Sequence, residues 1–73
     1  MSARIEKDIT LFQDSVEKLK PFKLSAKERE VLELAIDYSK DAGSWLSKGD
    51  LYTAFASISY AHGLLDALIK TRA

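Results

Sequence analysis

The chain has no cysteine among its 73 residues. This absence excludes disulfide bonds, thiolate metal sites and a thiol nucleophile. A domain of this length buries only a modest part of its surface, so it must rely on good apolar packing or share its core with a second copy. We therefore expect one domain, residues 1–73, with a clean pattern of apolar positions.

Glycine, proline and net charge are scarce as well. Three glycines and one proline suit long helices better than a β fold with many turns. Eleven basic and eleven acidic residues give a net charge of +0, without the basic excess typical of nucleic-acid binders. No apolar run approaches the length of a membrane span, and the opening MSARIEKDIT is charged where a signal peptide would be apolar. We expect a cytoplasmic protein without membrane contact.

Apolar residues recur at steps of four and three in three segments, which places them on one side of a helix in each. In residues 3–20 they are Ile5, Ile9, Phe12, Val16 and Leu19. In residues 26–47 they are Val31, Ala35, Tyr38, Ala42 and Trp45, with Leu34 and Leu46 widening the stripe. In residues 51–71 they are Leu51, Ala54, Phe55, Ile58, Ala61, Leu65 and Leu68.

Two short breaks separate these helices. Pro21 ends the first helix, and Ser25 with Glu28 forms the capping-box pattern that begins the second. Gly49 suits the left-handed position after a helix end, and Asp50 suits the N-cap of the third helix. The sequence predicts an all-α, up-down-up three-helix bundle in which the first and third helices are parallel.

The third helix is unusual, because no charged side chain occurs from Leu51 to Leu65 if His62 is neutral. A helix that is apolar nearly all round is either central in its bundle or part of an interface. With two neighbouring helices, one strip of it should stay outward and could form a two-fold dimer. The alternative is that the first helix covers the strip and leaves a monomer. The strip consists of Tyr52, Ala56, Tyr60 and Leu64.

The first connection and the end of the third helix should meet at one pole of the bundle. Phe22 and Leu24 are expected to tuck under this end. Cations also gather there, so a neutral chain could still attract anions locally. The candidate basic residues are Lys18, Lys20, Lys23, Lys27, Lys70 and Arg72.

A few polar residues lie among apolar ones. His62 and Asp66 share a helix face, and Asp37 could lie opposite His62. Such a cluster could bind a metal or move a proton, but we favour a structural hydrogen-bonded role for His62. We expect Asp66 and Asp41 to have structural partners too, because an unpaired buried charge is costly.

The second half of the chain also carries a family resemblance. The resemblance rests on the stretches 38–42, 49–55 and 58–67 and on Trp45. Together they combine turn residues, small residues and aromatic residues at set positions. This pattern resembles a family of short archaeal proteins catalogued as domain of unknown function 357. The likeness covers residues 26 to 70 well and the first helix loosely. It implies a compact helical bundle of archaeal origin, and it implies no catalytic residue.

The sequence gives little support for catalysis. It contains no glycine-rich phosphate loop, no ordered nucleophile triad and no metal-ligand spacing. We expect no catalytic residue and no cofactor. The leading hypothesis is a protein-interaction or assembly module. The alternative is an anion or nucleic-acid accessory protein that uses the basic end, and a metal-dependent enzyme ranks last.

Overall fold

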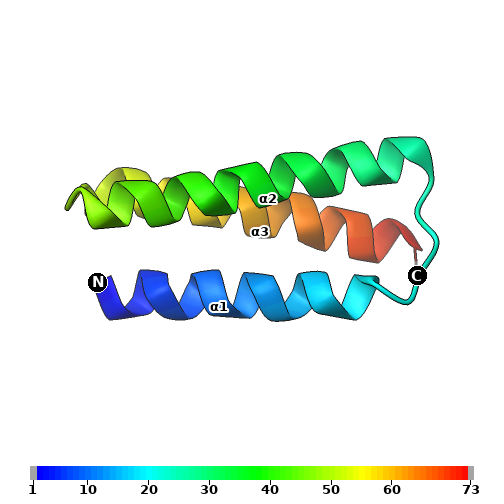
Figure 1. Ribbon diagram of the computed structural model, residues 1–73, viewed down its shortest axis with the longest axis horizontal. Coiled ribbons are helices and arrows are strands. Elements are labelled where there is room, and N and C mark those ends of the chain that lie inside the picture. Colours follow the sequence, from blue (N-terminus) through cyan, green and yellow to red (C-terminus); the bar gives the residue numbers. More distant parts are fainter. Residues whose placement is uncertain (1, 73) are drawn as a thin grey trace.

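The computed structural model describes residues 2–72, and the side chains of residues 2–71. Three helices follow one another: α1 (Ser2–Leu19), α2 (Ala26–Ser47) and α3 (Leu51–Arg72). Helices α1 and α3 run in the same direction and α2 runs against them (Figure 1). The predicted up-down-up three-helix bundle is confirmed, and the predicted helix ends are right to within one residue.

Local interactions explain where α2 begins and where α3 follows it. The Ser25 hydroxyl accepts the Glu28 N–H at 3.1 Å, and the Glu28 carboxylate accepts the Ser25 N–H at 2.8 Å. Gly49 has φ +81°, in the left-handed region that glycine favours. The Asp50 carboxylate accepts the Thr53 backbone N–H at 3.0 Å and its hydroxyl at 2.8 Å, which lowers the pKa of Asp50. The expected capping box, turn glycine and N-cap are therefore all present.

The core receives side chains from all three helices. Small residues let α2 and α3 approach closely, so these two helices form a tight hairpin, and α1 packs on it less intimately. The buried apolar residues are Ile5, Phe12, Leu19, Ala35, Ala42, Ala54, Ile58, Ala61, Leu65 and Leu68.

The predicted stripe on α2 is partly wrong. Trp45 and Leu34 lie at the surface, whereas Ser39 is buried and Leu32 and Ile36 are half-buried against the core. The buried face of α2 is rotated because this helix has to meet α1 as well as α3. Lys48 covers the displaced indole of Trp45, with its Nζ 4.8 Å from the ring centroid.

Two phenylalanines also differ from expectation. Phe22 is exposed, because the connection carries it along the outside of the bundle, while Leu24 is half-buried as expected. Phe55 is 38% exposed, since it follows the buried Ala54 at the edge of the α3 stripe. Among residues 2–72, no helix is long and apolar enough to cross a membrane.

Candidate functional site

The α3 strip predicted from the sequence lies on the surface. Tyr52 is 82% exposed and Tyr60 is 51% exposed, and Ala56 between them is exposed too. Leu64 is half-buried and packs against the core. Helix α1 therefore leaves most of the strip uncovered, and its role as an interface stays a prediction.

The two strip tyrosines differ in how firmly they are held. The ring of Tyr60 meets that of Tyr38 on α2 edge-on, with centroids 4.6 Å apart and planes at 72°. This geometry is favourable for aromatic pairs and orients Tyr60. Tyr52 has no ring contact within residues 2–71. Tyr52 is thus the more accessible of the two rings.

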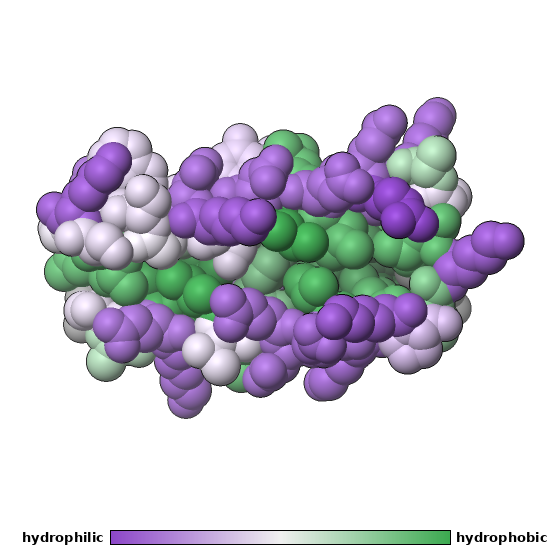
Figure 2. All heavy atoms as spheres, viewed as in Figure 1, coloured by the Kyte–Doolittle hydropathy of each residue, from purple (hydrophilic) through white to green (hydrophobic). Residues whose placement is uncertain are grey.

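A second apolar surface lies between α1 and α2. Figure 2 shows it as a lengthwise band of hydrophobic residues between two hydrophilic rims. Two hollows, of about 350 and 200 Å³, share Val16 and Ile36 in their linings and so lie next to each other. We call the two together the α1–α2 groove. It is lined by Phe12, Gln13, Val16, Glu17, Leu19, Lys20, Phe22, Lys23, Leu24, Arg29, Leu32, Ile36, Ser39 and Lys40.

The charges of the α1–α2 groove are unbalanced. Its lining holds four cationic side chains and one carboxylate, a net charge of +3, in a chain whose net charge is +0. Glu17 is already bound to Lys20 at 2.9 Å. Within residues 2–71, Lys23, Arg29 and Lys40 have no ion pair. The groove is therefore an apolar channel with a positive lining.

The predicted basic pole is divided between two sides of the bundle. Lys18, Lys20, Lys23, Lys27 and Lys70 are all exposed, while the side chain of Arg72 lies outside the described residues. Lys20 and Lys23 line the α1–α2 groove. Lys27 instead lines a separate hollow, of about 290 Å³, with residues of α2 and α3.

Sequence reasoning missed the α2 wall of the groove. Arg29, Leu32, Ile36 and Lys40 follow one another at steps of three and four, which places them along one side of the helix. This pattern is present in the sequence. However, two apolar residues with a cation on either side are also typical of the boundary between the buried and solvated faces of a helix. Only the structure, in which Leu32 and Ile36 are half-buried, distinguishes the wall of a groove from such a boundary.

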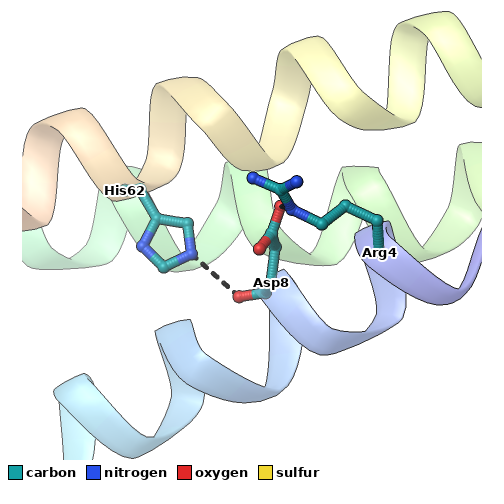
Figure 3. A network of polar contacts seen from close by, with 3 residues as sticks. All are labelled: Arg4, Asp8 and His62. Carbon is teal, nitrogen blue, oxygen red and sulfur yellow. Dashed lines mark hydrogen bonds and ion pairs between the residues drawn. The ribbon is translucent and has the colours of Figure 1, made fainter. Parts of the chain in front are cut away.

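His62 connects α3 to α1. Its Nε2–H donates to the backbone carbonyl of Asp8 at 2.8 Å, and its ring meets Phe12 edge-on at 5.7 Å. Figure 3 shows the imidazole directed at α1, next to the Asp8 carboxylate that pairs with Arg4 Nε at 3.5 Å. The contact joins one helix to the other, and the structural role of His62 stays a prediction.

The carboxylates proposed beside His62 do not assemble with it. Asp37 and Asp66 are exposed, and within residues 2–71 no three histidine, aspartate or glutamate side chains are grouped to hold a metal. The expected partners of Asp66 and Asp41 are also missing, since neither has an ion pair or hydrogen bond within this part of the chain. Both carboxylates face water, which solvates them without a partner.

Comparison with known proteins identifies a family. A family model described as "Protein of unknown function (DUF357)" matches residues 7–72, nearly the whole chain. The chain belongs to this family, which agrees with the resemblance of its second half and extends it over most of α1. No curated protein matches the chain.

Proposed function

We propose that this member of the DUF357 family is a protein-interaction or assembly module that acts without catalysis. The supporting observation is the uncharged outer strip of α3, where Tyr52 is 82% exposed and Tyr60 is 51% exposed. Apolar and aromatic patches of this kind are typical of contact surfaces, because aromatic rings gain much from burial at an interface.

A second copy of the chain is the simplest partner for the strip. In a two-fold dimer the same surface meets itself, so one strip without charge satisfies both sides. A domain of 73 residues also gains stability when part of its surface is buried by association.

The test uses two lysine substitutions and a matched control. Tyr52→Lys puts a charge into the strip at a position without a ring contact, so it should leave the fold intact, and Tyr60→Lys additionally breaks the contact with Tyr38. Leu11→Lys is the control, because Leu11 is an exposed apolar residue of α1 outside the strip.

Light scattering at high micromolar concentration should give more than the monomer mass for the parent and for Leu11→Lys. Both tyrosine variants should have the monomer mass, and their melting temperatures should no longer depend on concentration. A parent that is monomeric under these conditions would rule out self-association through the strip.

The alternative function is an anion or nucleic-acid accessory role at the basic end of the bundle. It has weaker support, because Lys27 lies on a different side from Lys20 and Lys23. Titration with RNA or polyphosphate at low salt tests it. The amide resonances of this pole should shift on that hypothesis, and unchanged resonances would remove it.

Two further predictions, on location and on origin, accompany the proposal. The sequence predicts a cytoplasmic location, and the family resemblance implies an archaeal origin. Imaging of a tagged copy in an archaeal cell would test the location, and enrichment at the membrane or outside the cell would contradict it.

A further inference from the structure

The α1–α2 groove is separate from the α3 strip, and we infer that it binds an acidic amphipathic helix of another protein. This inference does not depend on self-association through the strip. It rests on three features of the groove: the incomplete contact between two helices, the apolar floor, and the positive charge of the lining.

The bundle is open on the side where α1 and α2 face each other. Both helices pack on α3, but they approach each other least of the three pairs. Val16, Leu32 and Ile36 are consequently only half-buried. A further helix laid along this side would cover them and complete a four-helix arrangement, and an amphipathic helix in an apolar groove is one recurring mode of peptide recognition.

The charge of the lining selects among occupants. Lys23, Arg29 and Lys40 have no ion pair within residues 2–71, so carboxylates of an incoming helix would find free partners. A second copy seated groove to groove would bring together two linings of net charge +3, which repel. A nucleic acid would neutralise the cations but leave Val16 and Ile36 in water.

The position of the cations also sets the direction of the bound helix. Lys23 and Arg29 lie at the end of the groove near the first connection. The C-terminal end of a helix carries the negative end of its dipole, so this end should lie beside them. The bound helix would then run parallel to α1 and antiparallel to α2.

Two synthetic peptides test the inference. Each has 18 residues, the length of α1, and leucines spaced to form one helical stripe. One carries glutamates on its other faces and the second carries lysines at the same positions. The acidic peptide should shift the amide resonances of Val16, Leu32 and Ile36 in isotope-labelled protein and leave those of Tyr52 and Tyr60 in place. The basic peptide should bind at least about tenfold more weakly.

Charge-reversed variants provide the matched control. Lys23→Glu combined with Arg29→Glu changes two exposed side chains of the groove, and should weaken binding of the acidic peptide about tenfold at low salt and less at high salt. Lys7→Glu combined with Lys18→Glu makes the same change of net charge on exposed positions outside the groove. This second variant should bind the peptide as the parent does.

Several results would overturn the inference. Equal affinity for the two peptides, or equal loss in both charge-reversed variants, would mean that the lining does not select an acidic partner. Resonance shifts confined to the α3 strip would place the peptide on the other surface. Binding of decanoate to the groove without binding of the acidic peptide would assign the groove to a small anionic amphiphile instead.

Discussion

Replacing Gly49 with alanine should destabilise the protein by about 1 kcal/mol. A residue with a Cβ atom loses about 1–2 kcal/mol in the left-handed conformation that φ +81° imposes at this position. Alanine also restricts the unfolded chain, which offsets about 0.4–1 kcal/mol of that cost. A Cβ at Gly49 would meet no atom within 4 Å, so a clash adds nothing to the difference. The expected change therefore comes from the backbone alone, and Gly49→Val should cost at least as much.

The other two glycines supply controls of opposite sign. Gly43 lies within α2 and Gly63 within α3, neither has a positive φ, and a Cβ at either would also meet nothing within 4 Å. Alanine is better than glycine inside a helix by about 0.5–1 kcal/mol. Gly43→Ala and Gly63→Ala should each stabilise the protein by about that amount.

Urea unfolding followed by far-ultraviolet circular dichroism measures all three changes. For a domain of this size the free energy of unfolding falls by about 1 kcal/mol per molar urea. The midpoint should fall by about 1 M for Gly49→Ala and rise by roughly 0.5–1 M for the two helical variants. Light scattering should first show that each variant has the same molecular mass as the parent. This control is needed because Gly63 is close to the α3 strip, where a substitution could also change self-association. A shift of the same sign at all three glycines would refute the backbone argument.

Three further predictions concern single polar contacts. Ser25→Ala should destabilise the protein by about 1 kcal/mol in the same urea unfolding experiment, because the capping box is lost. Ser44→Ala, at an exposed helical position, should change the free energy of unfolding little. His62→Leu should cost about 1 kcal/mol by loss of the 2.8 Å bond to the Asp8 carbonyl, and a neutral result would mean that leucine packing replaces it. The pKa of Asp50 in the folded protein lies below the ordinary value of 3.8. The contribution of Asp50 to stability is therefore complete above pH 3.8 and is lost as the pH falls through the lowered, folded-state pKa. The free-energy difference between the parent and Asp50→Asn should therefore shrink in acid, and parallel pH curves for the two would contradict the assignment.

The elements with strong local signals could be predicted from the sequence. The stripe of α1 is correct from Ile5 to Leu19, because one side of this helix is apolar and the others are charged. The helix ends at the two connections are also correct, since a capping box and a glycine before an aspartate have few alternative structures, but the expected burial of Phe22 in the first connection is wrong. The lack of charge in α3 also indicated that a strip of this helix would lie at the surface, where Tyr52, Ala56 and Tyr60 are exposed. It gave no information on which helix would contact the ring of Tyr60.

The face of α2 could be predicted only in part: Val31, Ala35, Tyr38, Ala42 and Leu46 are buried or pack against the core as expected, whereas Trp45 and Leu34 do not. Apolar residues occupy more than one side of this helix, and the stripe through Tyr38 and Trp45 is longer than the one through Leu32 and Ile36. The choice depends on the position of α1, which is determined by contacts far apart in the chain, such as that of His62 with Asp8. Periodicity describes one helix at a time, so it cannot contain this information.

The same error concealed the α1–α2 groove. The predicted stripe of α2 includes Trp45 but neither Leu32 nor Ile36, and no role was predicted for Arg29 or Lys40. Once α2 is rotated toward α1, the four residues form one wall opposite Val16. The balance of basic and acidic residues in the whole chain then has little bearing on binding, because folding places an excess of cations along one apolar channel. A partner responds to that local excess and to the apolar floor beneath it, and both depend on the rotation of a single helix.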